Sequence, residues 1–502
     1  MPQGTAERFA VLKLSRLDRG SGQSLQAQVY QAIRTAIMRG SMTPGMRLPP
    51  TREYAEILGV ARNTVILAVQ RLKDEGFVEA RAGDGTYVST QAQGFSQQRV
   101  GARTIQPPRG MDESDLSRRG RRIAECSVTW EPRQPVRRPF RIGEPAVDVF
   151  PFQLWERLSR ETSDRTQRAL AGYQPASGHV PLRKAIAEFL ALSRGIVCGA
   201  EQVLVTTGSQ QGIDLVCRML LDEGDEVFLE DPGYLGTRAN LIAHAARIVP
   251  VPVDAEGLQI GWAQKRHPRA RFAVVTPTHQ FPLGVTMSLA RRLQMIHWAG
   301  QHGGWIIEDD YGGEFQYGER GIPALCSIDN SGRVIYAGTL SKILHPGIRL
   351  GFLVLPIGLV DAFTRAKSIA DRHCPGHTQD VLARFITEGH LYRHLRKVRK
   401  LYPHRQAVMI DALHDASGGR IALEPSSTGM HLTFEIAGGP RRVPDDRWLT
   451  QRAFEQGIEV APLSAYSIES TRRGWAFGYA AYNDAEIRKA AQAIGRILRE
   501  KK

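Results

Sequence analysis

The chain has 502 residues, with 42% apolar residues, 23% charged residues and a formal net charge of +15. This length is too great for one hydrophobic core, so two or three domains are expected, and the composition is that of a globular protein. Positive charge is concentrated near the N-terminus: residues 1–90 carry 12 Lys and Arg against 8 Asp and Glu, and residues 91–140 carry 10 against 5. A basic N-terminal part indicates a polyanionic partner, although a solvated basic surface would give the same count.

The five cysteines are far apart in the sequence and form no C-x-x-C pair. This spacing argues for reduced thiols in a cytoplasmic protein and against a zinc site or a disulfide framework. The N-terminus has no apolar signal core. The longest apolar run, residues 350–363, is interrupted by Pro356, Gly358 and Asp361 and is too short to span a bilayer. We therefore expect neither a membrane segment nor a bound metal.

The first ninety residues predict a small domain of three helices and a hairpin. The predicted elements are helices over residues 24–39, 51–58 and 61–75 and strands over residues 77–81 and 86–88. Apolar residues recur at helical spacing in the first helix, Gly40 and Gly59 end the first two helices, and Thr51 is expected to cap the second. A turn over residues 82–85 joins the strands. This order of elements is that of a winged helix-turn-helix, whose last helix lies in the DNA major groove.

Three segments of this domain, residues 42–49, 58–65 and 83–88, resemble the GntR branch of winged-helix regulators. The residue types then indicate contacts with phosphates, base edges and the minor groove. The DNA-binding candidates are Arg52, Arg62, Asn63, Thr64, Arg81 and Gly83. Members of the family often have an arginine where this chain has Ile66, so base readout there is open. A winged helix that binds only protein is the alternative.

Residues 91–139 change character and sustain no apolar period. They contain several glutamines and the arginine pairs at 118–119 and 121–122, which predicts a long, basic and largely flexible linker. These arginines would either contact DNA phosphates or belong to a solvated tether. The predicted domains are the winged helix over 1–90, the linker over 91–139, and a body over 140–502 with a large part to about 361 and a small C-terminal part from about 362.

From Phe140 onward, short runs of Val, Ile and Leu alternate with longer helical patterns, which predicts an α/β fold with a mostly parallel sheet. Strands are predicted over residues 203–207, 227–230, 272–276, 305–307 and 333–339. A glycine-rich turn over residues 208–212 precedes a predicted helix over residues 213–221. The small C-terminal part is expected to be α+β, with a strand around residues 475–479.

Lys342 stands in the segment on which the body's chemistry depends. It follows the predicted strand that ends at Thr339, and Arg349 comes seven residues later, after a Pro-Gly turn. Loops beyond the carboxyl ends of strands are where open α/β sheets bind ligands. A partly desolvated lysine beside an arginine favours its neutral amine, which Schiff-base chemistry requires. The pattern suggests an aldehyde cofactor that also carries a phosphate.

This segment resembles the cofactor-lysine segment of fold-type I pyridoxal phosphate (PLP) enzymes, the aspartate aminotransferase superfamily. The resemblance implies that Lys342 forms a Schiff base with PLP and that Arg349 binds the phosphate. Thr339 and Ser341 are then candidate hydroxyl donors to the phosphate, and Ser209 and Gln210 are candidate parts of an anion cradle at a helix start.

The same resemblance assigns further contacts. Tyr234 is expected to stack on the pyridine ring, Asp309 to pair with the pyridine nitrogen, with Asp310 as the alternative, and Tyr311 to contact the ring oxygen. The asparagine that usually contacts this oxygen is absent, so the contact passes to His279 or Gln280 or is lost. Tyr173 is expected to reach the neighbouring subunit's site, which implies a homodimer.

One expected group is missing from its usual place. Aminotransferases carry an arginine for the substrate carboxylate about three residues before an aromatic residue, and that count leads to Ala476, with Arg472 and Arg473 displaced. The missing arginine weakens the case for amino-acid turnover.

A GntR-type winged helix, a basic linker and a fold-type I body in one chain resemble the MocR family of PLP-dependent regulators. The resemblance implies a bacterial cytoplasmic regulator that binds promoter DNA, on two half-sites if it is dimeric, and senses an amino compound or PLP itself through Lys342. The alternatives are an active aminotransferase with a DNA-binding attachment and an inactive body that serves only as a dimerisation scaffold.

Overall fold

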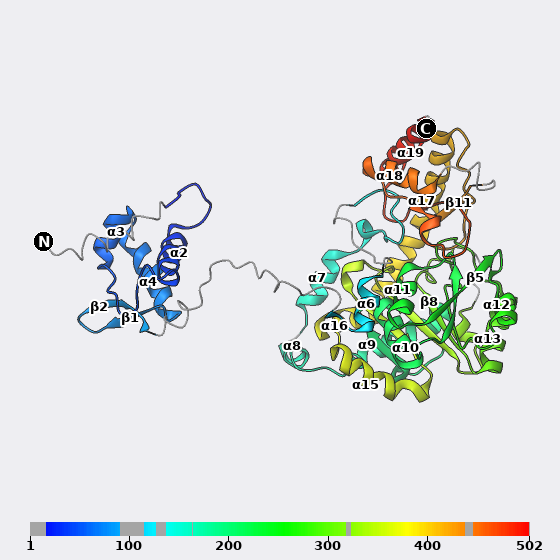
Figure 1. The fold of residues 1–502 in the computed structure, drawn as a ribbon, viewed down its shortest axis with the longest axis horizontal. Helices are drawn as coiled ribbons and strands as arrows, with labels where there is room; N and C mark the ends of the chain where they lie inside the picture. Colours follow the sequence, from blue (N-terminus) through cyan, green and yellow to red (C-terminus); the bar gives the residue numbers. More distant parts are fainter. Residues whose placement is uncertain are drawn as a thin grey trace. The chain divides into compact units, whose positions relative to one another are not determined.

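The computed structural model describes residues 17–90, 115–126, 137–162, 164–317, 323–436 and 445–500. The chain divides into two compact units, Met1–Asp112 and Glu113–Lys502 (Figure 1). The buried side chains of the first unit form a cluster separate from the clusters of the second. Most of the residues predicted as linker, 91–114 and 127–136, lie outside the described part of the chain.

The first unit has the predicted order of three helices and a hairpin. Its elements are α2 (Leu25–Met38), α3 (Thr51–Leu58), α4 (Arg62–Asp74), β1 (Val78–Arg81) and β2 (Gly85–Val88). Ser24 caps α2, because its side chain accepts a hydrogen bond from the Ala27 backbone N–H. Gly59 ends α3 in the left-handed region, at φ 62°. β1 and β2 pair antiparallel, with Val78 opposite Val88.

The expected cap of α3 is wrong. Pro50 flanks the helix at its start, Thr51 is already its first helical residue, and no side chain caps this end. The fixed φ of proline suits the residue that leads into a helix, so the helix begins without a hydroxyl cap. The Thr51 hydroxyl instead accepts a hydrogen bond from Arg62 Nε at 3.5 Å.

The second unit, the body, is built on an eight-stranded sheet with the order β3-β10-β9-β8-β7-β4-β5-β6. The strands are β3 (Val203–Thr206), β4 (Glu226–Asp231), β5 (Arg247–Asp254), β6 (Gly257–Leu258), β7 (Phe272–Val275), β8 (Trp305–Asp310), β9 (Val334–Thr339) and β10 (Gly351–Val354). β5, β4, β7, β8 and β9 run parallel, and β10 runs antiparallel to both β9 and β3.

Helices cover both faces of this sheet (Figure 1). They are α7 (Phe152–Arg160), α8 (Asp164–Leu170), α9 (Val180–Arg194), α10 (Ser209–Leu220), α11 (Leu235–Ala243), α12 (Ile260–Arg266), α13 (Leu289–His302), α14 (Leu325–Ile328), α15 (Val360–Asp371) and α16 (Gly376–Thr387). Alternate residues of one strand enter different clusters: Phe272 packs with residues of α10 and α15, whereas Ala273 packs with residues of α12 and α13. The predicted doubly covered α/β architecture is confirmed.

The C-terminal part adds a three-stranded sheet in the order β11-β13-β12 and three helices. Its elements are α17 (His390–Ser417), β11 (His431–Glu435), α18 (Asp446–Glu455), β12 (Ala461–Pro462), β13 (Gly474–Gly478) and α19 (Asp484–Arg499). Its buried residues, such as Phe477 and Ile494, belong to the same cluster as Leu182 and Phe385 of the large part. The two parts of the body therefore share one core.

Two local predictions differ from the structure. The connector is not featureless, because residues Arg118–Ala124 form helix α6, which Ser117 caps through Gly120 N–H and which Arg122 joins to Glu223 by an ion pair of 2.7 Å. A capped start and a long-range ion pair stabilise a segment in which apolar periodicity is absent. Helix α10 starts at Ser209 and not at residue 213, so the expected glycine-rich turn is mostly its first turn.

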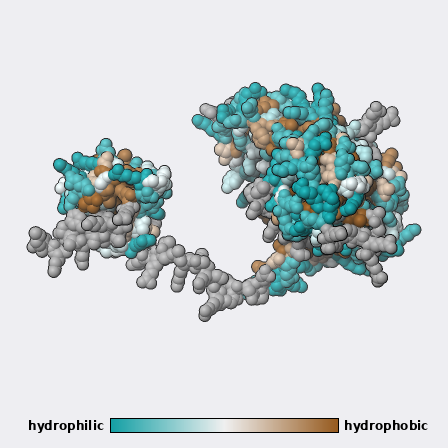
Figure 2. Space-filling view, turned by 90° about the horizontal axis from the view of Figure 1, so that it is seen from above, coloured by the Kyte–Doolittle hydropathy of each residue, from teal (hydrophilic) through white to brown (hydrophobic). Residues whose placement is uncertain are grey.

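The described surface of the body is mixed, with hydrophilic side chains interrupted by smaller hydrophobic patches (Figure 2). No helix within the described ranges combines the length and apolarity needed to cross a membrane. Among the described residues no group of three or more His, Cys, Asp or Glu is placed to hold a metal ion. The five cysteines are free thiols.

Candidate cofactor and DNA-binding sites

One edge of the body's sheet gathers most of the predicted cofactor residues. Since β4, β7, β8 and β9 run parallel, their carboxyl ends meet at this edge. The antiparallel β10 starts there, because Gly351 pairs with Thr206 on one side and Thr339 on the other. Asp309 lies at the end of β8 and Thr339 at the end of β9. Lys342 and Arg349 lie between β9 and β10. This edge is where open α/β sheets bind ligands.

Lys342 lies three residues beyond Thr339, the last residue of β9, and is half-buried. Its Nζ donates a hydrogen bond to the Gly143 carbonyl oxygen at 2.6 Å. Burial lowers the pKa of the Lys342 amine, and the charges of Glu144 and Asp309 oppose this shift. A lowered pKa increases the fraction of neutral amine, which is the form that attacks an aldehyde.

Asp309 is the penultimate residue of β8 and is only 4% exposed. Burial, reinforced by the charge of Asp310, raises its pKa to about 7, whereas Lys342 acts to lower it. Its Oδ1 is buried and has no hydrogen-bond partner among the described residues. An orphaned buried carboxylate oxygen needs a donor from a bound molecule or from water.

Asp310 has a different environment. Its Oδ2 accepts hydrogen bonds from Arg194 Nε at 2.8 Å and from the Tyr336 hydroxyl at 3.0 Å. Arg194 is itself buried and also donates to Thr278 Oγ1. Asp310 Oδ1 is also buried without a partner among the described residues, but Oδ2 is engaged in an internal ion pair, so the geometry favours Asp309 over Asp310 as the carboxylate available to a ligand.

His279 and Tyr311 lie together near the Asp309 carboxylate. The Tyr311 hydroxyl donates to the His279 carbonyl oxygen at 2.7 Å, and His279 Nδ1 lies 3.0 Å from Thr428 Oγ1. His279 is fully enclosed, and burial, with His431 nearby, places its pKa well below the ordinary value. Its Nε2 has no partner among the described residues and faces Gly429, where an added Cβ would come within 2.2 Å. His279 is therefore a neutral ring with one nitrogen still available.

Gln280, the other candidate for the ring-oxygen contact, is occupied within the protein. Its side-chain amide donates to the Pro232 carbonyl at 2.9 Å, the Phe281 carbonyl at 2.7 Å and Glu230 Oε2 at 3.2 Å. Glu230 is buried, and burial raises its pKa to about 7. These bonds make Gln280 a structural residue, which leaves His279 as the remaining candidate of the two.

Tyr234 and Gln210 meet at Gly236. A Cβ added at Gly236 would lie 2.5 Å from Tyr234 Cε1 and 2.4 Å from Gln210 Oε1, while Gln210 Nε2 donates to the Gly236 carbonyl at 2.8 Å. The Tyr234 ring packs edge-on against Phe281 with centroids 5.4 Å apart. Burial and the charge of Asp309 raise the pKa of Tyr234 to about 12, so its hydroxyl stays protonated.

The predicted phosphate contacts surround the start of α10. A Cβ added at Gly208, the residue before this helix, would lie 3.8 Å from an Arg349 guanidinium nitrogen, so the arginine lies beside the helix start. Ser209 is the first residue of the helix. Thr339 Oγ1 accepts a bond from the Ser341 N–H at 3.3 Å, and Ser341 is half-buried. A helix N-terminus and a guanidinium group together favour an anion.

The structure does not bring every predicted residue to this cluster. Tyr173 is 90% exposed, and its ring lies 6.1 Å from that of His373. Ala476 is buried in β13, Arg472 pairs with Glu435 at 2.6 Å, and Arg473 lies 3.6 Å from Asp446. The expected position of the carboxylate-binding arginine is therefore held by alanine, and its two neighbours have acidic partners elsewhere.

Sequence reasoning missed some contacts of the site. The Gly143 carbonyl is 199 positions away from Lys342, and Asp231 accepts backbone hydrogen bonds from Ile468, Glu469 and Ser470. Main-chain partners leave no signal in residue type. Only the Asp-Pro-Gly-Tyr pattern around residue 231 could have drawn attention to that carboxylate.

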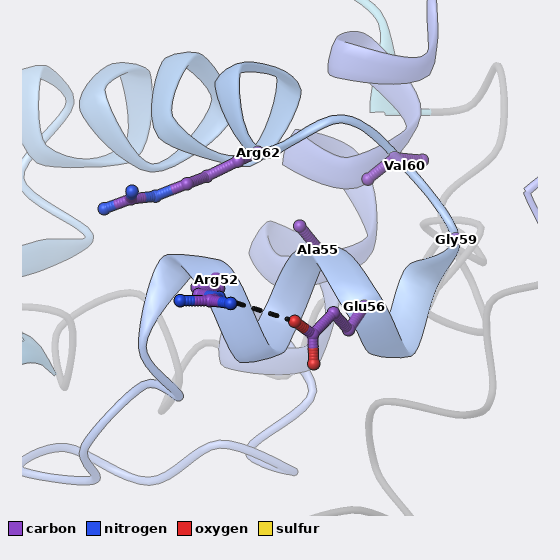
Figure 3. Close-up of a pocket in the computed structure, with 6 residues that line it drawn as sticks. All are labelled: Arg52, Ala55, Glu56, Gly59, Val60 and Arg62. Carbon is purple, nitrogen blue, oxygen red and sulfur yellow. Dashed lines mark ion pairs between the residues drawn. The ribbon is translucent and has the colours of Figure 1, made fainter.

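The second candidate site is the start of α4 in the first unit. Arg62 and Asn63 are exposed, and Thr64 is half-buried with its N–H bonded to the Ala61 carbonyl at 2.9 Å. An open hollow is lined by Arg52, Ala55, Glu56, Gly59, Val60 and Arg62. Arg52 pairs with Glu56 at 3.6 Å, and Figure 3 shows this pair on α3 with Arg62 extending from the start of α4 on the other side of the hollow. Two neighbouring cations suit a DNA phosphate.

The hairpin presents the remaining DNA-binding candidates. Arg81 pairs with Glu79 at 3.1 Å and lies over the Tyr87 ring, 4.3 Å from its centroid. Gly83 has φ 76°, and a Cβ there would meet nothing within 4 Å. Arg81 is thus held on the strand with an acidic partner, whereas Gly83 is at the open tip.

Residues 25–88 match the family of bacterial regulatory proteins, gntR family, and residues 142–494 match aminotransferase class I and II. A protein of Rhizobium meliloti, named as the probable rhizopine catabolism regulatory protein MocR, is 37% identical over 95% of this chain and 94% of its own length. The chain belongs to the MocR family of regulators. The HTH-type transcriptional regulator TauR of Rhodobacter capsulatus is 31% identical over 96% of this chain and 98% of its own.

The MocR-family assignment confirms the predicted combination of a GntR-type helix-turn-helix and a fold-type I body. Among solved structures, the α-aminoadipate aminotransferase LysN of Thermus thermophilus, complexed with N-(5'-phosphopyridoxyl)-L-leucine, aligns with a TM-score of 0.66 at 28% identity over 72% of this chain and 91% of its own. The likeness agrees with PLP as the predicted cofactor. Three features of the site fit such a molecule. They are the buried Asp309 oxygen without a partner among the described residues, the Lys342 amine with its lowered pKa, and the start of α10 with Arg349 beside it.

Proposed function

We propose that this MocR-family chain is a transcription regulator whose body binds PLP at Lys342 and uses that site to sense a small amino compound, or PLP itself. The observation that carries the proposal is the pairing of Lys342, an amine with a lowered pKa just past β9, with buried Asp309 and its unpartnered oxygen. A lysine and a carboxylate that influence each other's pKa in one site suit an aldehyde on a pyridine ring.

Bound PLP supplies an aldehyde that combines reversibly with primary amines. In this proposal Lys342 Nζ is the resident amine, and Asp309 Oδ1 accepts the hydrogen bond of the pyridine N–H and keeps that nitrogen protonated. Arg349, Ser209 and the backbone N–H groups at the start of α10 hold the phosphate. Tyr234 covers one face of the ring and excludes water.

Two groups remain for the cofactor's phenolic oxygen. The Tyr311 hydroxyl and His279 Nε2 lie in the same cluster, and burial keeps the first protonated and the second neutral. The Tyr311 hydroxyl currently donates to the His279 carbonyl, so a second acceptor would compete for that proton. This pair replaces the asparagine that the segment at Phe281 lacks.

In the cofactor-free protein Lys342 Nζ donates to the Gly143 carbonyl. Joining Nζ to the aldehyde would weaken this bond, and an effector amine that took the place of Nζ would free it to form the bond again. Gly143 lies three residues after Phe140, which pairs with Gly478 of β13. The bond therefore links Lys342 to the segment through which the chain enters the body. A coupling of about 1–3 kcal/mol between effector and DNA sites suffices to change promoter occupancy.

The competing function is an active aminotransferase with a DNA-binding attachment, which the fold and the cofactor residues favour. Against it stand the alanine at position 476, where the carboxylate-binding arginine was expected, and the engagement of Arg472 with Glu435 and the Val253 carbonyl. We propose that turnover is at most residual.

The proposed partners are promoter DNA with two half-sites, a second copy of the chain, and the effector, all in the bacterial cytoplasm. The exposure of Tyr173 supports a homodimer, because a ring that is 90% exposed in one chain would become buried against a neighbour. Sedimentation of the full chain, compared with Tyr173→Ala, tests this interface.

The function is tested by titrating the purified full chain with PLP and then with a panel of amino compounds, while visible absorbance and keto-acid formation are followed together. A spectral shift that stops without keto acid supports a sensor and identifies its effector, whereas steady keto-acid production supports the enzyme. Lys342→Ala should abolish the PLP-dependent band, and the exposed lysine variant Lys400→Ala should retain it. A band that survives in Lys342→Ala would leave only the scaffold function.

A further inference from the structure

Two apolar side chains lie on the outer face of α4, the helix that the proposed function places against DNA. Ile66 is 39% exposed and Leu67 is 51% exposed. Both lie in the second turn of the helix, after the polar residues of its first turn. The opposite face of α4 supplies the core, because Val65, Ala68 and Leu72 are fully buried. The packing of the domain therefore gives no reason for isoleucine and leucine at 66 and 67.

Polar and cationic groups surround this pair along the helix. Residues four apart lie on one face of a helix, so Arg62 is next to Ile66 and Asn63 is next to Leu67. Gln70 follows one turn later, exposed, with its amide donating to Asp74 at 2.8 Å. Arg52 lies beside Arg62 across the hollow in Figure 3. The outer face is thus cationic at its start, apolar in its second turn and polar at Gln70.

This sequence of groups fits one occupant, the major groove of DNA. The cations pair with phosphates and set the depth of the helix, and Asn63 and Gln70 can read base edges. An isoleucine and a leucine between them cannot form hydrogen bonds with a base. The one apolar group that base pairs present in the major groove is the 5-methyl group of thymine.

Single exposed apolar residues are common on protein surfaces and need no explanation. Ile66 and Leu67 differ because they are adjacent, stand on the face with Arg62 and Asn63, and occupy the turn that follows these residues, at the N-terminal end with which a recognition helix contacts base edges. A guanine or cytosine opposite them would leave its donors and acceptors unpaired.

We infer that Ile66 and Leu67 form an apolar reader of thymine, which makes an A·T pair near the centre of each half-site a requirement of this regulator. The inference rests on the proposed function, since it assumes that α4 enters the major groove. It specifies the base pair that the DNA partner must contain opposite the second turn of α4, where the exposed side chains are apolar.

The test begins with the full chain and a pool of random double-stranded DNA. Sequences selected by the wild-type protein should share thymine at one or two central positions of the half-site. Each conserved thymine is then replaced by deoxyuridine, which removes only the 5-methyl group. At the contacted position the wild-type protein should lose about fourfold in affinity, the effect of one buried methyl group.

The decisive measurement is a double-mutant cycle between DNA and protein. In Ile66→Ala/Leu67→Ala the same uracil substitution should change affinity less than 1.5-fold, because the methyl group has lost its apolar contact. Both residues are exposed, so thermal unfolding of the variant should match the wild type. Leu293→Ala, at an equally exposed leucine in the body (52% exposed), is the matched control and should keep the full fourfold effect.

A third variant asks whether the position can be re-specified. Ile66→Arg should move the selected base pair from A·T to G·C, because arginine pairs with the guanine edge through two hydrogen bonds. Equal uracil effects in the wild type and the double variant would overturn the inference, and so would selected sites without a shared thymine. A double variant that alters only the oligomeric state would assign the patch to a protein surface and overturn it too. If the wild-type chain binds no DNA at any salt concentration, the proposed function itself fails.

Discussion

The two candidate sites of this chain differ in how their residues are held. In the body, Lys342, Asp309 and His279 are wholly or partly buried and are fixed by long-range contacts such as the bond from Lys342 Nζ to Gly143. At the second site, Arg52 of α3 and Arg62 and Asn63 at the start of α4 are exposed, and Arg52 and Arg62 contact residues no more than 11 positions away, Glu56 and Thr51. The first site is built to shift the pKa values of its groups, and the second presents groups whose effect depends on charge and salt.

This difference determines how each unit can select its ligand. A buried site discriminates through groups that lose water and must be paired, so one substitution there removes a whole chemical step. An exposed cationic face binds any polyanion with graded strength, and base selection requires further residues. Substitutions in the body should therefore abolish a step altogether. Substitutions in the first unit, the head, should change the affinity for DNA and its dependence on salt by degrees.

The largest effect is expected from Lys342→Ala, which removes the only amine assigned to the aldehyde. Borohydride reduction after PLP addition should incorporate cofactor covalently into the wild type and the Lys400→Ala control and not into the variant, as measured by mass spectrometry. DNA affinity without effector should change less than twofold, because the head is untouched. Loss of DNA binding together with the cofactor would show that the two units do not act separately.

Asp309→Asn should change the pH dependence of stability in the cofactor-free protein. The buried Asp309 carboxyl keeps its proton up to about pH 7, whereas in the unfolded chain it ionises near its ordinary value of 3.8. Its contribution is therefore fully present below pH 4 and is lost as the pH rises to 7. Asparagine cannot ionise, so the free energy of unfolding of the variant relative to the wild type should rise between pH 5 and pH 8 by roughly 2–3 kcal/mol.

Thermal or denaturant unfolding at the two pH values measures this difference. Glu230 and Glu314, whose pKa values burial also raises to about 7, are present in both proteins and cancel. Asp361→Asn, at the exposed start of α15, is the control and should show no such trend. A parallel pH profile for Asp309→Asn and the wild type would mean that Asp309 is not held in its protonated form.

Local patterns were enough to predict most of the fold, and long-range contacts explain what they missed. Helix α2 and the hairpin of the first unit follow from apolar spacing and from the glycines at the helix end and the turn, all within a few residues of each other. Helix α6 was missed because it has no apolar period and is joined to the body by the ion pair of Arg122 with Glu223, 101 positions away.

The candidate site shows the same division. Lys342 and Arg349 were found because a strand end and a Pro-Gly turn are adjacent in the sequence. The choice between Asp309 and Asp310 could not be made from residue type. It depends on Arg194, 116 positions from Asp310, whose guanidinium group donates to Asp310 Oδ2. The hydrogen bonds from Gln280 to main-chain carbonyls could not be predicted from residue type either.

In the head, Arg62→Ala should weaken DNA binding about tenfold at moderate salt, uniformly across DNA sequences. It should also reduce the slope of log affinity against log salt by about 1, because one phosphate contact is lost. Fluorescence anisotropy over a salt series measures both quantities. Arg218→Ala, an exposed arginine of α10 in the body, is the control, and an unchanged slope in Arg62→Ala would remove this residue from the DNA interface.

Arg81 should have the smallest effect, because its guanidinium group already has a partner. It pairs with Glu79 and lies over Tyr87, so binding a phosphate would require exchange of a carboxylate for a phosphate at nearly constant charge. Arg81→Ala should therefore weaken DNA binding less than threefold. Glu79→Gln should strengthen binding by a similar factor, since it frees the arginine and removes a negative charge near the phosphates. If Glu79→Gln leaves the affinity and its salt slope unchanged, the hairpin does not approach the DNA, and the contacts of this head are confined to α3 and α4.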